Sequence, residues 1–214
     1  ESAIDCAISM AKIDFDLIIE DEFTWMLWND VEYARESLRN SIAEDKEHNF
    51  RGTHFAIALC AHDYEIILSL LDDMGDVLST DQVAYGRADY SAKLGRYDDA
   101  VRYITELIDA KEDALEIYYL ISERCGYYRL AGEYEKALAD ADRLVELVPD
   151  EVYGHYQRGW IYELMGNDEA AMENYNRGIE VDNSYAYIYL IRGEHYLKYG
   201  DTERAKMRRP ADRF

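Results

Sequence analysis

Proline, cysteine and positive charge are scarce in this chain of 214 residues, which holds 2 Pro, 3 Cys and 23 Lys and Arg against 45 Asp and Glu. So few prolines, with 12 glycines, exclude a collagen-like or low-complexity chain and favour long helices. No apolar run approaches the roughly 18 residues that a membrane-spanning helix needs. The apolar fraction of 49% is too high for a disordered acidic chain, so we expect a soluble folded protein.

The charge balance limits the class of partner. The formal net charge is −22, and a surface of that sign repels the phosphates of nucleic acids. We therefore expect no nucleic-acid ligand and no membrane association. Residues 206–214 differ from the rest, because four bases and one acid make them a basic tail.

The cysteines indicate a reducing compartment. Cys6, Cys60 and Cys125 are odd in number and far apart, so they outline neither a disulfide framework nor a CxxC site. We expect reduced thiols and a cytoplasmic protein. The first residue is Glu rather than Met, which leaves open a leader peptide that has been removed.

A period of 34 residues runs through the second half of the chain, and such a period is typical of a solenoid. Five columns share one register: Gly132, Gly166 and Gly200; Ala137, Ala171 and Ala205; Tyr128, Tyr162 and Tyr196; Arg124, Arg158 and Arg192; Tyr119, Tyr153 and Tyr187. Gly95, Ala100 and Arg87 extend three columns upstream with a spacing of 37. The longer spacing predicts a three-residue insertion in the connection around 110–117.

Each unit has the pattern of two amphipathic helices joined at a glycine. Gly166 suits the left-handed conformation that ends a helix, and Asn167 or Asp168 can cap the next one. Gly159 lacks bulk where two antiparallel helices must approach closely, and Tyr175 fills space beside it.

This pattern resembles the tetratricopeptide repeat, a 34-residue helix-turn-helix. The residues that match best are Gly159, Tyr162, Gly166, Ala171 and Tyr175. The resemblance implies an all-α protein, a right-handed superhelical solenoid of antiparallel helix hairpins. We predict four such repeats over 81–205, starting near 81, 118, 152 and 186, the last incomplete. The repeat from 118 departs from the pattern with Cys125 at the small position and Ala141 where an aromatic is usual.

Residues 1–80 are predicted to hold degenerate hairpins of the same kind. The two-helix rhythm continues at 17–28 with 31–43, and at 51–61 with 63–74. Residues 52–77 also resemble an ankyrin repeat, and this alternative stays open.

Both ends of the sequence have the pattern of an interrupted repeat. Residues 3–14 resemble a second helix whose first helix is missing, and Pro210 interrupts the last helix. Because an uncapped repeat exposes its stacking surface, we expect either a segment of a longer protein or ends covered by another chain.

No catalytic or metal-binding pattern occurs. None of the five histidines has metal-ligand spacing, so all are expected to be structural or on the surface: His48, His54, His62, His155 and His195. We expect no enzyme, no cofactor and no metal. The regular Arg column is expected to pair with nearby acids, and Asp140 is the predicted partner of Arg124.

The resemblance also assigns a binding surface, because tetratricopeptide repeats line a concave groove with their first helices. The residues expected to contact a peptide there are Tyr85, Tyr119, Arg129, Tyr153, Tyr156, Trp160, Glu163, Tyr187 and Glu194. Tyr and Trp concentrate at binding hot spots, but some of these rings are alternatively packing residues. The family's best-known groove holds the terminal carboxylate of chaperone tails with Lys, Asn and Arg. Most of those positions are Tyr, Ser, Glu or Trp here, which disfavours that ligand.

The sequence therefore predicts a protein-interaction module with an aromatic, acid-rimmed groove. Its partner is expected to present basic and apolar residues, because complementary charge favours encounter. Two alternatives stay open: a structural scaffold that self-associates through the solenoid ends as a homo-oligomer, and a regulatory segment of a larger protein.

Overall fold

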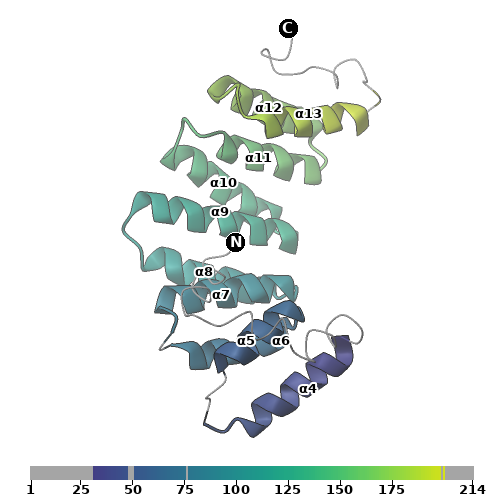
Figure 1. The fold of residues 1–214 in the computed structure, drawn as a ribbon. Coiled ribbons are helices and arrows are strands. Elements are labelled where there is room, and N and C mark those ends of the chain that lie inside the picture. Colours follow the sequence, from purple (N-terminus) through teal and green to yellow (C-terminus); the bar gives the residue numbers. More distant parts are fainter. Residues whose placement is uncertain (1–30, 48–50, 76, 199, 201–214) are drawn as a thin grey trace. The chain divides into compact units, whose positions relative to one another are not determined.

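The structure is a computed structural model that describes residues 31–47, 51–75, 77–198 and 200. These residues form ten α-helices, labelled α4 to α13, and one 3-10 helix, with no strand among them (Figure 1). The chain divides into two compact units, Glu1–Leu107 and Ile108–Phe214. The predicted helices at 3–14 and 17–28, Pro210 and the basic tail lie outside the described residues.

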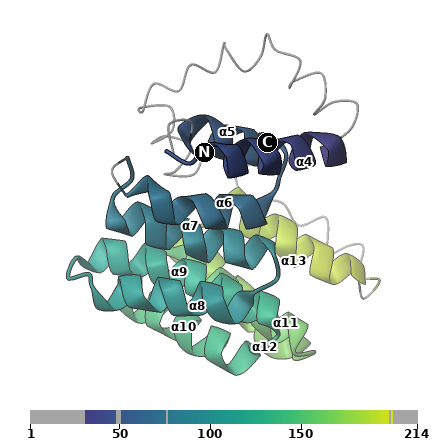
Figure 2. The same cartoon turned by 90° about the horizontal axis from the view of Figure 1, so that it is seen from below.

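The first unit is a succession of helices around one apolar core. Its elements are α4 (Val31–Glu44), α5 (Arg51–Cys60), α6 (Tyr64–Leu71), η1 (Asp72–Met74), α7 (Thr80–Lys93) and most of α8 (Tyr97–Asp109). Figure 2 shows α4 and α5 at one end, with α6 and α7 beyond them. Phe55, Ile67 and Met74 are among the fully buried side chains of this core. The hairpin predicted at 51–61 and 63–74 and the helix predicted at 31–43 are confirmed.

The second unit contains two complete hairpins and a further helix. They are α9 (Ala114–Ala131) with α10 (Tyr134–Leu147), α11 (Val152–Leu164) with α12 (Asp168–Val181), and then α13 (Ala186–Lys198). Each helix packs on the next one along the chain, so the core runs as a continuous layer between them. This is the predicted solenoid of helix hairpins.

The turns form as the glycine column predicts. Gly132 and Gly166 have φ of +78° and +76°, the left-handed conformation that glycine adopts without steric cost. Of the two candidate caps after Gly166, Asn167 takes the role, because its side chain accepts a hydrogen bond from the Ala170 N–H at 3.2 Å.

The three-residue insertion lengthens a helix as well as a connection. The helix α9 begins at Ala114, four residues before the repeat start predicted near 118. The Asp113 carboxylate caps it by accepting from the N–H groups of Leu115 and Glu116, each at 3.0 Å. The cap makes an extra helical turn favourable where a loop was expected.

The Arg column holds neighbouring helices together. The predicted pair is confirmed: the Arg124 guanidinium donates to both Asp140 carboxylate oxygens, at 2.6 and 2.9 Å. The other members also contact a polar partner: Arg87 with Asp72, Arg158 with Asp142 and Arg192 with Asn176. The column therefore has a structural role within each unit.

Candidate functional site

A cavity of about 430 Å³ opens between α11 and α13 in the second unit. Its lining is partly aromatic and partly charged: Tyr156, Trp160, Glu163, Leu164, Tyr187, Ile191, Glu194, His195 and Lys198. This size is within the range of small-molecule and peptide side-chain sites. We call it the aromatic cavity.

Five of the nine predicted contact residues line the aromatic cavity, namely Tyr156, Trp160, Glu163, Tyr187 and Glu194. Three others, Tyr119, Arg129 and Tyr153, lie in the same unit on α9 and α11. Tyr85 lies on α7 in the first unit and takes no part in this cavity.

Tyr156 is the centre of the aromatic contacts. Its ring centroid lies 5.9 Å from Tyr153, 5.6 Å from Trp160 and 5.4 Å from Tyr187. Only 4% of Tyr156 is exposed, against 44% of Tyr187. Burial and a hydrogen bond to Tyr187 raise the pKa of Tyr156, so its phenol stays neutral. Tyr156 therefore forms the floor of the site, and Tyr187 presents a free surface.

A cation fixes the orientation of the indole. The Arg129 guanidinium carbon lies 3.4 Å from the centroid of the Trp160 ring, a cation–π contact between α9 and α11. Arg129 forms no ion pair with a carboxylate in the part of the chain that the structure describes. The indole is thus held by packing from a neighbouring repeat and remains partly exposed.

The two acids of the aromatic cavity differ in their surroundings. Glu163 accepts a hydrogen bond from the Tyr175 hydroxyl at 3.1 Å and one from the Lys198 ammonium at 3.4 Å, and His195 Nδ1 lies 3.7 Å away. Glu163 therefore joins α11, α12 and α13. Glu194 is exposed and pairs with no cation among the described residues, so it is the acid available to a ligand.

A cluster of tyrosines continues from the aromatic cavity toward α9. We call it the tyrosine cluster: Tyr118, Tyr119, Tyr153, Tyr156, Tyr185 and Tyr187. The rings of Tyr118 and Tyr119 lie 5.8 Å apart, and those of Tyr185 and Tyr187 lie 6.4 Å apart. Burial, followed by the nearby Glu151, raises the pKa of Tyr118. Its buried hydroxyl has no hydrogen-bond partner among the described residues.

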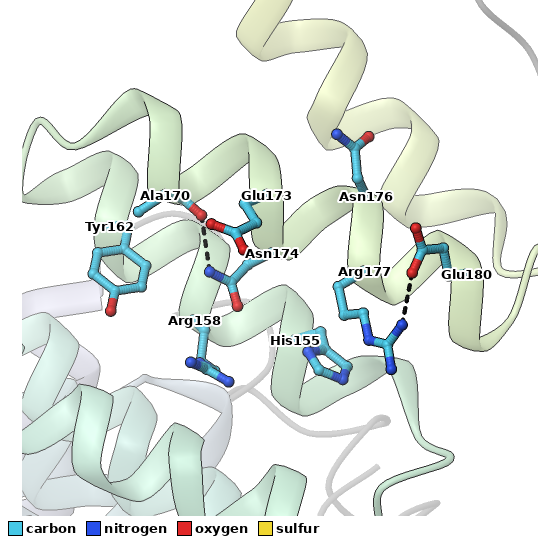
Figure 3. A pocket seen from close by; sticks show the side chains of 9 residues that line it. All are labelled: His155, Arg158, Tyr162, Ala170, Glu173, Asn174, Asn176, Arg177 and Glu180. Carbon is cyan, nitrogen blue, oxygen red and sulfur yellow. Dashed lines mark hydrogen bonds and ion pairs between the residues drawn. The ribbon is translucent and has the colours of Figure 1, made fainter.

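A second cavity, of about 510 Å³, lies between α11 and α12 and is polar (Figure 3). In Figure 3 the His155 imidazole lies between the guanidinium groups of Arg158 and Arg177. Burial and then these two cations lower the pKa of His155, so the imidazole is neutral. The cations are already engaged, since Arg158 pairs with Asp142 at 3.0 Å and Arg177 with Glu180 at 2.7 Å.

One side-chain group in the first unit resembles a catalytic arrangement. Ser41 Oγ lies 3.0 Å from His54 Nε2, and Asp45 Oδ2 lies 3.9 Å from His54 Nδ1. The second distance is too long for the hydrogen bond that orients a catalytic imidazole. With 4% of His54 exposed, a substrate has little access, so we assign the group a structural role.

The described residues contain no cluster of three or more side chains that could hold a metal ion. Within the same residues, no helix is both long and apolar enough to cross a bilayer.

The α11–α12 hairpin matches a family model. That model is described as the tetratricopeptide repeat, and it matches residues 152–185. The α11–α12 hairpin is thus a tetratricopeptide repeat. The matched repeat carries Trp160 and Glu163, so one wall of the aromatic cavity belongs to it.

Proteins named for chaperones are similar to part of this chain. Hsp70-Hsp90 organizing protein 2 of Arabidopsis thaliana is 33% identical over 87 residues, which are 41% of this chain and 15% of that protein. A DnaJ homolog subfamily C member 7 homolog of Schizosaccharomyces pombe is 33% identical over 147 residues, 60% of this chain and 30% of that protein. The chain thus spans less than a third of either relative.

Solved structures agree on the fold. A tetratricopeptide repeat protein from Parabacteroides merdae superposes with a TM-score of 0.57 at 18% identity, over 89% of this chain and 75% of that one. MamA from Desulfovibrio magneticus superposes with a TM-score of 0.54 at 16% identity, over 75% and 89%. The repeat and the relatives indicate a role in protein–protein interaction, and proteins of this family are generally non-catalytic.

Proposed function

We propose that the chain is a non-catalytic interaction module that binds a peptide segment of a partner protein in the aromatic cavity. The observation that carries this proposal is the arrangement of Trp160 and Tyr187, two partly exposed rings held over the buried ring of Tyr156. Rigid aromatic side chains give a large contact area at little cost in conformational entropy. Arg129 stacks on the indole, so the site is ordered before a ligand arrives.

The charge of the site favours a partner with Lys or Arg beside apolar residues. Glu194 lines the cavity and pairs with no cation in the part of the chain that the structure describes, and the net charge of −22 attracts cationic segments from a distance. Such attraction is screened over about 10 Å at 0.1 M salt. We expect the affinity for a basic peptide to fall as salt is raised, and an affinity that does not change would contradict the electrostatic part of the proposal.

The name of one relative, Hsp70-Hsp90 organizing protein 2, refers to Hsp70 and Hsp90, which raises chaperone tails as an alternative ligand. The groove positions of this chain do not favour it. A carboxylate clamp needs several free bases, whereas Lys198 pairs with Glu163 and Arg129 covers Trp160. An exposed acid, Glu194, also lies in the cavity lining.

The test is a selection from a random peptide display library on the whole chain. Peptides selected on the native protein are expected to lose binding to Trp160→Ala and to retain it on Tyr162→Ala. Tyr162 is the matched control, because it is a partly buried aromatic on the same helix that lines the polar cavity instead (Figure 3). Circular dichroism checks that both variants fold. Selected peptides that bind both variants equally would place the binding surface elsewhere.

A structural scaffold is the second candidate, and the exposed apolar side chains of α13 favour it. Leu190 is 54% exposed and Leu197 is 57% exposed. If they mediate self-association, the native chain forms a homo-oligomer that Leu190→Glu with Leu197→Glu dissociates, as sedimentation velocity would show. Peptide binding at Trp160 would be absent in that case.

A further inference from the structure

We infer that the segment bound at this site is proline-rich, takes the polyproline II conformation and carries Lys or Arg beside its prolines. This inference rests on the proposed function and specifies its partner. Proteins bind peptides in a few recurring ways, and each makes different demands on the residues that line the site. The residues of the aromatic cavity and the tyrosine cluster meet the demands of a polyproline II ligand.

Two of those ways do not fit the site. Adding a peptide strand needs an exposed sheet edge, and the described residues contain no strand. Recognising an acidic or phosphorylated motif needs a cluster of free arginines. No arginine is among the described residues that line the aromatic cavity, Arg129 stacks on Trp160 from α9, and Glu194 would repel an acidic ligand.

The composition of the lining distinguishes between two other ways, the binding of a helix and the binding of a polyproline II segment. An amphipathic helix buries a row of aliphatic side chains in a broad apolar groove, whereas a polyproline II segment docks on aromatic rings. The rings of Tyr156, Trp160 and Tyr187 dominate the apolar part of this lining, and the tyrosine cluster extends the aromatic surface. Flat proline rings can stack on such a surface.

Hydrogen-bonding capacity favours the same ligand. A polyproline II segment has no internal hydrogen bonds, and its prolines carry carbonyl acceptors without N–H donors. Tyr119, Tyr185 and Tyr187 are 61%, 36% and 44% exposed, and their hydroxyl groups are donors that such carbonyls can use. Burial raises the pKa of Tyr185, which keeps its phenol protonated and able to donate.

The spacing of the rings fits as well. Tyr153 and Tyr187 lie 5.9 and 5.4 Å from Tyr156, so their centroids are at most 5.9 + 5.4 = 11.3 Å apart. Every third residue of a polyproline II helix is displaced by about 9 Å along its axis. The upper limit on the ring separation is larger than this displacement, so it leaves room for two prolines three positions apart to contact rings from two successive repeats.

The test measures fluorescence anisotropy of labelled peptides of about 12 residues, long enough for several turns of polyproline II. The first peptide is proline-rich with flanking arginines. The second replaces its prolines with alanine and so keeps the charge while favouring a helix. Each is titrated with the native chain, Trp160→Ala, Tyr119→Phe with Tyr187→Phe, and the control Tyr162→Phe.

We expect the proline-rich peptide to bind more tightly than the alanine peptide. Loss of the two hydroxyl groups is expected to weaken that binding roughly three- to tenfold for each group that donates. Trp160→Ala is expected to weaken it by about 30-fold, as for a hot-spot aromatic, and Tyr162→Phe should leave it unchanged.

Two results would overturn the inference. The first such result is that the alanine peptide binds as tightly as the proline-rich peptide and is weakened equally by Trp160→Ala. The ligand is then a helix, and the proposed interaction site is retained. The second such result is that neither labelled peptide binds, whereas the display selection yields peptides that lack proline and depend on Trp160 for binding. Only the absence of any Trp160-dependent peptide in that selection would refute the proposed function itself.

Discussion

Replacing Gly159 with alanine tests how tightly the α11–α12 hairpin is packed. A Cβ at this position would lie 2.4 Å from Cε1 and 2.5 Å from Cδ1 of Tyr175. Carbon atoms pack at about 3.5–4.0 Å, so the ring would have to move by about 1 Å. Tyr175 is fully buried and its hydroxyl donates to Glu163, so it has little freedom to move.

The expected change in the free energy of unfolding is the difference between a cost of overpacking and a gain in helix propensity. Overpacking a core costs about 1–3 kcal/mol, whereas alanine in a helix interior is favoured over glycine by about 1 kcal/mol. Gly159→Ala should therefore lower the free energy of unfolding by up to about 2 kcal/mol. Gly126 is the matched control, because it also lies inside a first helix but has no atom within 4 Å of an added Cβ. Gly126→Ala should raise stability by about 1 kcal/mol.

The preceding repeat suggests a compensating change. Cys125 and Ala141 occupy the positions there that Gly159 and Tyr175 occupy in the next repeat. The larger residue of the pair is therefore on the first helix in the preceding repeat and on the second helix in the next one. Tyr175→Ala alone should cost about 3–5 kcal/mol, as for other buried aromatics. In that background Gly159→Ala should become stabilising.

The assay is urea unfolding followed by circular dichroism, for the native chain, both glycine variants, Tyr175→Ala and the double variant. The interaction energy of the cycle should be about 1–3 kcal/mol, within the range seen for contacting residues. The reasoning fails if Gly159→Ala stabilises the native chain as much as Gly126→Ala does.

Three further predictions concern stability. Asp140→Ala removes the carboxylate that accepts from the largely buried Arg124 guanidinium and should cost about 3 kcal/mol. Loss of the exposed ion pair through Glu180→Ala should change stability by less than about 0.5 kcal/mol, and denaturant melts measure both changes. Burial lowers the pKa of His54 more than Asp45 raises it, so below about pH 6.5 the unfolded chain binds more protons than the folded one. Stability should then fall as the pH is lowered through that value, and His54→Gln should flatten this slope in thermal melts. Asn167→Ala should cost about 1 kcal/mol through loss of the cap, unless the Ala170 N–H finds water instead.

The hairpins could be predicted from the sequence because their determinants are local and repeated. Gly166 at φ +76° and the cap at Asn167 follow from residue types next to each other in the chain. The Arg124–Asp140 pair could also be predicted from the sequence, because it joins the two helices of one hairpin at a fixed register. The extension of α9 could not be predicted, because whether added residues join a helix depends on a cap such as Asp113.

The sequence shows which residue types recur along the chain, but not how far each of their side chains is exposed. Tyr119, Tyr153 and Tyr187 occupy the same position in successive repeats. Tyr119 is nevertheless 61% exposed and Tyr153 is only partly exposed, because different neighbours cover each ring. Glu163 was expected to contact a peptide, as one of the acids at the edge of the groove. Its partners His195 and Lys198 come from the next repeat, and a single repeat pattern carries no information on such contacts.

The position of Glu163 has a consequence for the kinetics of binding. Because this one carboxylate is contacted by side chains from α12 and α13, the two walls of the aromatic cavity are fastened to each other in the free protein. A ligand then meets an opening of preset width and needs no rearrangement of the walls. Association should follow a single step whose rate constant rises linearly with ligand concentration, and Glu163→Gln should introduce a slower, saturating phase as the walls separate and reclose.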